Sequence, residues 1–146
     1  MWLDACLMSV EVRILPCDGL VVVRYTGTIL VSESVRAFSD YLDHPDFAPG
    51  QKHLIDLTDV TGFETDYVKI MQMQARKAAA FVGSGAPSLM VYLAPRQDTL
   101  GLAQLVARSW DSVAGVTALV QQDEARALSL LGIEDCTIAD LMARAG

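Results

Sequence analysis

The chain has 146 residues, of which 52% are hydrophobic, and it carries a formal net charge of −7. This length suits one domain with a core of its own, and the composition excludes a disordered chain. The charge excludes a nucleic-acid-binding surface, which needs cations to meet phosphates, and it disfavours adsorption to anionic lipid.

The chain shows no signal for membrane insertion or export. Its longest strongly apolar run, residues 20–23, is far shorter than the ~20 residues of a bilayer span. The N-terminus lacks a basic region and carries Asp4, so it is not a signal peptide. Translation can begin at Met1 or at Met8, so residues 1–7 are dispensable. We expect them to form a disordered lead.

Three cysteines occur in the chain, Cys6, Cys17 and Cys136. Their number is odd and their spacings are long, which fits neither a disulfide framework nor a zinc site. The sequence therefore predicts reduced thiols and a cytoplasmic protein.

The N-terminal elements are two strands. Residues 8–15 alternate between apolar and polar, which is typical of a half-buried strand. A turn at residues 16–19 leads to a more apolar strand at residues 20–26, which Gly27 is expected to end. Because the connection is short, the two strands should form an antiparallel hairpin.

A helix and a central strand come next. Ser32 is the expected N-cap of the helix, which should end by His44 because Pro45 disfavours helical backbone before it. The central strand is predicted at residues 53–57 and a polar turn at residues 58–62.

A long helix follows, capped by Asp66 or Thr65 and ended by the Gly- and Pro-containing residues 83–87. Its apolar stripe at i, i+3, i+4 spacing is predicted to contain Tyr67, Ile70, Met71, Gln74, Ala75, Ala78 and Val82. Large apolar side chains that fall off the main stripes, Met73, Phe81 and Leu100, can form an exposed patch that binds a partner.

The remaining elements alternate strand and helix. They are a strand at 88–94, a helix from Thr99 or Asp98 to Gly115, a strand at 116–120, a helix at 124–131 capped by Asp123, and a short helix at 138–144. The order is β-β-α-β-α-β-α-β-α, and helices between the last three strands make those strands parallel. We therefore predict one α/β domain over residues 1–146, with a single mixed sheet, an antiparallel N-terminal hairpin and helices packed on the sheet.

Several phrases occur in an order that resembles a known family. They are Tyr-Thr-Gly at 25–27, His-Pro-Asp-Phe at 44–47, Leu-Ile-Asp-Leu-Thr-Asp-Val at 54–60 and Asp-Glu-Ala-Arg-Ala-Leu at 123–128. With these phrases the chain resembles the SpoIIAA-like family over nearly its whole length. That family is related in fold to anti-sigma-factor antagonist (STAS) domains and to the lipid-binding Sec14 type. The resemblance implies a mixed sheet covered by helices, in a family most of whose members have no established activity.

The anti-sigma antagonists carry a phosphoswitch. There, a strand ending Asp-Leu-Ser leads to Asp-Ser-Ser-Gly, and the second Ser is phosphorylated at a helix N-terminus. Here residues 56–58 match the strand end, while residues 64–67 fall on the second motif. Asp66 takes the acceptor position and bulky Tyr67 that of Gly, so the resemblance implies no working serine phosphoswitch. Thr65 is a candidate acceptor in a shifted register.

Polar side chains gather after the predicted parallel strands, where open α/β sheets bind ligands. The candidate ligand-binding residues are Asp56, Thr58, Asp59, Thr61 and Arg96, with Asp98, Thr99, Gln121 and Gln122 in equivalent places. The guanidinium of Arg96 suits an anionic ligand. The alternative is an Arg96 that forms a surface ion pair with Asp98 or Asp59.

Catalytic and metal chemistry find little support. The carboxylates Asp56, Asp59, Glu64 and Asp66 have the oxygen ligands of a Mg²⁺ site, but strand-end and helix-cap roles explain two of them, so we predict no metal. His44 and His53 have no Gly-x-Ser-x-Gly nucleophile motif to serve. The glycines in residues 83–85 follow a helix, unlike those of a dinucleotide-binding motif. No catalytic residue and no cofactor are predicted.

The sequence therefore favours a non-enzymatic binding or regulatory module that resembles the anti-sigma antagonists. Its expected partner is another protein or a second copy in a homodimer. The alternative is a carrier of a small apolar or acidic ligand, which predicts a deep apolar pocket. An enzyme of unknown reaction ranks third.

Overall fold

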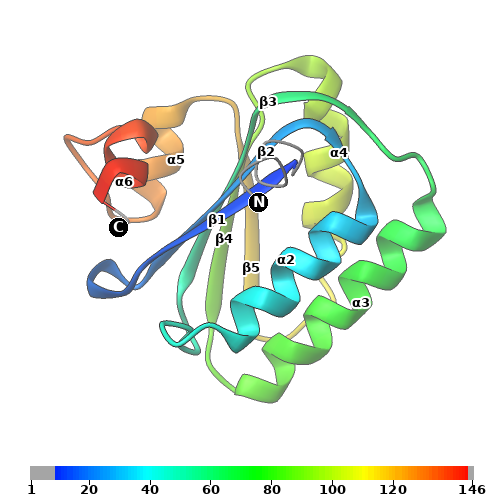
Figure 1. Cartoon of the computed structure of the whole chain (residues 1–146), viewed down its shortest axis with the longest axis horizontal. Coiled ribbons are helices and arrows are strands. Elements are labelled where there is room, and N and C mark those ends of the chain that lie inside the picture. Colours follow the sequence, from blue (N-terminus) through cyan, green and yellow to red (C-terminus); the bar gives the residue numbers. More distant parts are fainter. Residues whose placement is uncertain (1–8, 145–146) are drawn as a thin grey trace, which may run out of the picture.

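The computed structural model describes residues 9–144 (Figure 1). The expected lead at residues 1–7, Cys6 and both candidate start residues lie outside this range. The elements are β1 (Val10–Leu15), a 3₁₀ turn η1 (Pro16–Asp18), β2 (Leu20–Ile29), α2 (Val31–Asp43), β3 (Lys52–Phe63), α3 (Tyr67–Ser84), β4 (Ser88–Leu93), α4 (Gln97–Arg108), β5 (Val116–Gln121), α5 (Glu124–Leu130) and α6 (Ile138–Arg144).

The described strands form one mixed sheet in the order β1-β2-β3-β4-β5. The β1–β2 pair is antiparallel, and the β2–β3, β3–β4 and β4–β5 pairs are parallel. The predicted fold class is therefore confirmed: a single mixed sheet with an N-terminal hairpin and the expected order of helices and strands. The short terminal helix is also present, as α6.

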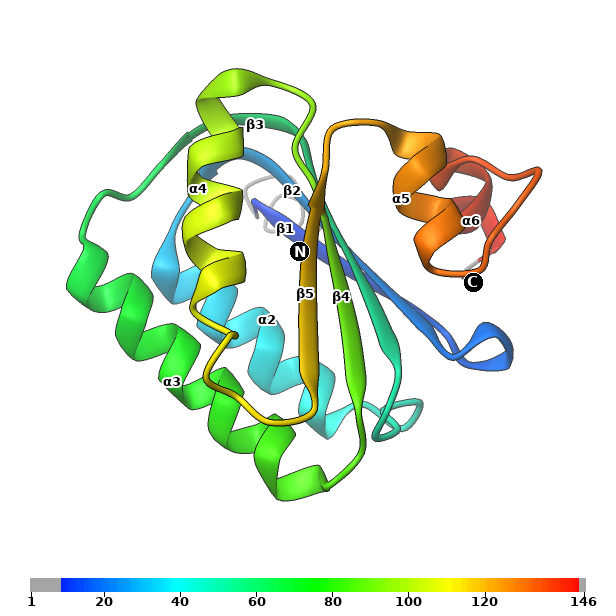
Figure 2. The same ribbon diagram turned by 180° about the vertical axis from the view of Figure 1, so that it is seen from behind.

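Helices cover both faces of the sheet. The helices α2, α3 and α4 lie on one face, and α5 and α6 lie on the other (Figures 1 and 2). Successive side chains of a strand point to opposite faces. On β3, Ile55 and Leu57 pack in the cluster beneath the first group of helices. Leu54 packs with Leu128 of α5 in the second cluster. Burial on both faces explains why the central strands are almost continuously apolar.

Two strands are longer than predicted. β2 continues through Gly27, whose φ of 68° is left-handed, and β3 continues to Phe63 through the predicted turn at residues 58–62. The two extensions pair with each other, and register shifts near Gly27 absorb the irregularity. The recorded β3–β4 pairing ends at Asp56, so the last part of β3 has β2 as its strand partner. Polar residues are tolerated there because this part of β3 is more exposed than residues 53–57.

Two helix starts also differ from the prediction. α2 begins at Val31, before the expected cap Ser32. The carboxylate of Glu64 accepts a hydrogen bond from the Val31 backbone nitrogen at 2.9 Å, so a distant side chain takes over a local cap's role. α4 begins at Gln97, one or two residues before the predicted start.

Other helix ends agree better with the local signals. Asp66 caps α3 by accepting from Lys69 N at 3.1 Å, and Asp123 caps α5 by accepting from Arg126 N at 3.0 Å. Both caps were predicted. The predicted end at Gly115 of the helix that starts at Thr99 or Asp98 is wrong, because α4 ends at Arg108 and turns fill the interval.

The predicted stripe of α3 is the clearest error. The side chains of Tyr67, Met71 and Val82 are exposed, whereas Met73 is buried and Phe81 packs against the core. The proposed exposed patch of Met73, Phe81 and Leu100 is therefore wrong, since Leu100 also packs against the core. The inner side of α3 carries Ile70, Met73, Gln74, Lys77, Ala78 and Phe81. Gln74 and Lys77 are polar, so the inner side of α3 is not a continuous apolar stripe, and a search for apolar residues at helical spacing placed the stripe wrongly.

Candidate functional site

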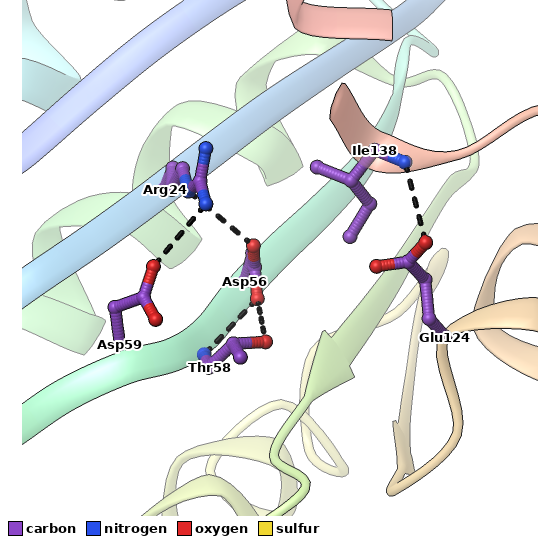
Figure 3. A network of polar contacts seen from close by, with 6 residues as sticks. All are labelled: Arg24, Asp56, Thr58, Asp59, Glu124 and Ile138. Atoms are coloured by element: carbon purple, nitrogen blue, oxygen red, sulfur yellow. Dashed lines mark hydrogen bonds and ion pairs between the residues drawn. The ribbon is translucent and has the colours of Figure 1, made fainter. Parts of the chain in front are cut away.

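Three of the predicted ligand-binding residues lie together in one polar network (Figure 3). Asp56 is 2% exposed, and its Oδ1 accepts from both the nitrogen (3.0 Å) and the hydroxyl (2.5 Å) of Thr58. Arg24 extends from β2, with its Nε 3.7 Å from Asp56 Oδ2. Its Nη2 donates to Asp59 at 3.2 Å. The network thus ties the neighbouring strands β2 and β3 together.

This network leaves little for a ligand to bind. Both oxygens of Asp56 face partners within the protein, and Arg24 is shared between two carboxylates. The other two candidates lie apart from it. Thr61 is exposed, and Arg96 Nε donates to Asp98 at 3.1 Å, which is the surface pair named above as the alternative. This geometry fits a structural role for Asp56 better than a ligand site.

Metal and phosphate chemistry gain no support from the geometry of the described residues. Within residues 9–144, no group of three or more His, Cys, Asp or Glu side chains is placed to hold a metal ion. Thr65 is exposed in the segment before α3, while Glu64 and Asp66 on either side of it act as helix caps.

The two histidines have very different surroundings. His44 lies in an exposed loop, where its Nδ1 accepts from Asp46 N at 3.0 Å. His53 is buried, and the rings of Tyr41 and Phe81 each lie edge-on at 5.4 Å. Burial, reinforced by the charge of Lys77, lowers the pKa of His53 to about 4, so the imidazole is neutral at pH 7. Its Nε2 is buried without a hydrogen-bond partner in the described structure.

This burial predicts a pH-dependent stability. In the unfolded chain His53 binds a proton near pH 6.5, whereas in the folded chain it binds one only near pH 4. The contribution of neutral His53 to the free energy of unfolding is therefore complete above pH 6.5 and is lost as the pH falls towards 4. Between pH 7.5 and 5.5 this should cost about 1.3 kcal/mol of unfolding free energy. Urea titrations at both pH values measure the fall in unfolding free energy between pH 7.5 and pH 5.5. This fall should be smaller in His53→Phe than in the wild type by the amount given above. Equal pH losses would refute the assignment.

A hollow lies on the sheet face covered by α2, α3 and α4. It offers about 110 Å³ to the centres of water-sized molecules. Side chains of β1 to β4 form its floor, and the three helices form its roof. Most of the wall is apolar, with Val23 and Ile55 from the sheet facing Phe38, Met73 and Val106 from the helices. The carrier alternative predicts an apolar pocket, and this hollow is the place in the described structure where that prediction can be tested.

Polar side chains interrupt the apolar wall at a few places. Tyr25 OH lies 2.6 Å from Ser34 Oγ, and Lys77 Nζ donates to the same oxygen at 3.4 Å. The Lys77 ammonium also lies 5.7 Å from the centre of the Phe38 ring. Within the described part of the chain, no carboxylate lies within ion-pair distance of Lys77.

A second polar group on the wall joins the turn after α4 to the sheet. Trp110 Nε1 donates to Tyr92 OH at 3.0 Å, and burial raises the pKa of Tyr92, so its hydroxyl stays protonated. Gln74 Nε2 donates to Ser109 Oγ at 3.0 Å and links α3 to α4. These bonds satisfy polar groups that would otherwise be costly inside an apolar cavity.

An apolar pocket was expected of a carrier, but neither its place nor its lining residues could be read from the sequence. Its size depends on how far α3 stands from the sheet, which no local pattern encodes. One signal was available: Lys77 sits at helical spacing from Ile70, Met73 and Gln74, on the inner side of an amphipathic helix. A cation in that place indicates either a polar partner inside the domain or an opening to solvent.

The comparisons with known proteins support the fold and leave function open. No protein-family model and no curated protein matches this chain. A solved structure from Shewanella loihica PV-4, of an uncharacterised protein of the DUF3478 family with a SpoIIAA-like fold, is similar with a TM-score of 0.54. It is 12% identical, and the match covers 84% of this chain and 91% of that chain. The chain therefore has a SpoIIAA-like fold, as its sequence indicated.

None of the described helices has the length and hydropathy needed to cross a membrane.

Proposed function

We propose that this chain of SpoIIAA-like fold is a non-enzymatic binding protein that holds one small, largely apolar molecule in its interior. The observation that carries the proposal is the hollow between the sheet and α2, α3 and α4. Protein interiors pack like organic crystals, and few domains contain voids much larger than a water molecule. A void of this kind forfeits contacts between its walls, and an apolar ligand would restore them.

The volume sets the size of the ligand. A single water needs roughly 10–15 Å³ measured for its centre, so the 110 Å³ hollow admits about ten non-hydrogen atoms. That size corresponds to a substituted aromatic ring or a chain of about eight carbons. A whole phospholipid is far larger. The cavity therefore favours a small-molecule carrier or sensor over a membrane-lipid exchanger.

Filling the cavity should weaken binding. Ala103 lines the hollow from α4 and is fully buried, so Ala103→Leu places three extra carbons against the space. Ala75→Leu is the matched control, because Ala75 is exposed on α3. Calorimetric titration with 1-octanol should show saturable binding to the wild type and the control, and about tenfold weaker binding to Ala103→Leu. Absence of binding to the wild type would refute the proposal.

The non-enzymatic part of the proposal rests on how the polar wall groups are engaged. A serine beside a lysine can act as nucleophile and base. Here Ser34 is 2% exposed, and its oxygen is already contacted by Tyr25 and Lys77. We expect the wild type and Ser34→Ala to hydrolyse p-nitrophenyl butyrate equally slowly, so that no measured hydrolysis depends on Ser34. Turnover that depends on Ser34 would contradict this part alone.

A regulatory module that binds another protein is the second candidate, as the resemblance to the anti-sigma antagonists suggests. One observation favours it: Tyr67, Val68 and Met71 at the start of α3 are 54%, 68% and 38% exposed. Adjacent exposed apolar side chains are common at partner surfaces. If the partner is a second copy, sedimentation equilibrium should detect a dimer that Tyr67→Lys dissociates. A monomer at high micromolar concentration would exclude the homodimer.

A further inference from the structure

We propose that the ligand is an amphipathic carboxylate of about ten non-hydrogen atoms, whose acidic head is bound by Lys77 and Ser34 while its apolar body fills the hollow. This inference rests on the proposed function, because it names the chemical class that the same cavity takes.

The charged side chains on the cavity wall favour an acidic ligand. One carboxylic and one amino side chain line the cavity, those of Glu64 and Lys77. Glu64 is already compensated, since its Oε1 accepts from Val31 N at 2.9 Å and its Oε2 pairs with Lys69 at 3.4 Å. Lys77 has no such compensation among residues 9–144, although the whole chain carries a net charge of −7. The wall therefore presents a positive charge that an anion can neutralise.

The hydrogen bonds around Ser34 can leave donors available to a ligand. Its oxygen can accept from both Tyr25 OH (2.6 Å) and Lys77 Nζ (3.4 Å). With Tyr25 as donor, the Ser34 hydroxyl proton is free to donate to a further oxygen. The ammonium of Lys77 also has three protons, only one of which is used on Ser34. Together they form a cluster of donors, which suits a carboxylate and offers less to an alcohol or an amine.

Much of the remaining wall differs from this donor cluster in being apolar. Val23, Ile55, Met73 and Val106 offer no polar atoms of their own side chains to a ligand. His53 is neutral, because burial and the charge of Lys77 lower its pKa to about 4. A molecule with one acidic end and an apolar body matches this distribution. A sugar or a nucleotide would leave many polar groups without partners.

The test compares octanoate with 1-octanol, which have the same chain length and differ in the head group. Calorimetric titrations should use the full chain as wild type, Lys77→Met, Lys77→Arg and Arg76→Met. Arg76 is the matched control, because it is an exposed cation next to Lys77 on the same helix. Circular dichroism should confirm that each variant is folded.

We expect octanoate to bind the wild type at least about tenfold more tightly than 1-octanol. Lys77→Met should remove this preference by weakening octanoate binding far more than 1-octanol binding, whereas Arg76→Met should change neither, and Lys77→Arg should retain part of the preference. Equal affinities for both ligands, or an equal loss in Lys77→Met and Arg76→Met, would overturn the inference and leave the proposed function intact. If neither ligand binds the wild type, the proposed function fails as well.

Discussion

Replacing Trp110 with alanine is expected to lower the free energy of unfolding by about 3–5 kcal/mol. Trp110 is 2% exposed, and its ring lies edge-on to Phe81 with the centroids 5.5 Å apart. The substitution removes the largest fully buried side chain among residues 9–144. It also takes the hydrogen-bond donor from Tyr92 OH, whose partner distance is 3.0 Å. Because domains are stable by only about 5–15 kcal/mol, this variant should lie near the limit of folding.

Trp110→Phe is the control that separates packing from hydrogen bonding. It keeps an aromatic ring near Phe81 but leaves Tyr92 without its donor, so we expect a smaller loss of about 1–3 kcal/mol. Urea unfolding followed by circular dichroism measures both variants without relying on tryptophan fluorescence. A loss below about 1 kcal/mol for Trp110→Ala would contradict the burial described here.

The second large effect is expected at Asp56. Asp56→Ala leaves the Thr58 nitrogen and hydroxyl without their acceptor, and it leaves Arg24 with Asp59 alone. Removing one partner of a buried ion pair costs about 3–5 kcal/mol. The Arg24 side chain is 35% exposed and keeps a second carboxylate, so we expect a smaller loss of about 2–3 kcal/mol.

Asp59→Ala is the matched control for this prediction. Asp59 pairs with the same arginine, but its side chain is 53% exposed, so its loss should cost less than about 1 kcal/mol. Chemical denaturation of both variants gives the comparison. If Asp56→Ala were no less stable than Asp59→Ala, the buried carboxylate would be free for binding, and the structural role given to it would be wrong.

Local signals in the sequence were enough to predict the order of elements and several of their ends. Asp66 and Asp123 precede helices and cap them as expected, because the N-cap bond joins residues only three apart. The alternation in β1 and the short turn after it led directly to the antiparallel hairpin. These features depend on contacts between near neighbours, which the sequence displays.

Features that depend on distant contacts could not be predicted. Residues 58–62 have the composition of a turn, yet they continue β3 because an extended β2 lies beside them. Glu64 caps α2 across 33 positions, so Ser32 looked like the better cap. The polar network illustrates the same limit. Asp56 and Asp59 stood out in the sequence, but Arg24 did not, because its place opposite Asp56 follows from the strand register.

The central claim is that the interior hollow takes up a small apolar molecule, and Trp110 in its wall can report this directly. The chain contains two tryptophans, so the measurement uses Trp2→Phe, in which Trp110 alone fluoresces. Titration with 8-bromo-1-octanol should quench this fluorescence in a saturable way, because a heavy atom must touch the indole to quench it. The same titration of Trp2→Phe with Ala103→Leu should show much weaker quenching. Fluorescence that stays constant in Trp2→Phe, or falls equally in both proteins, would contradict the account.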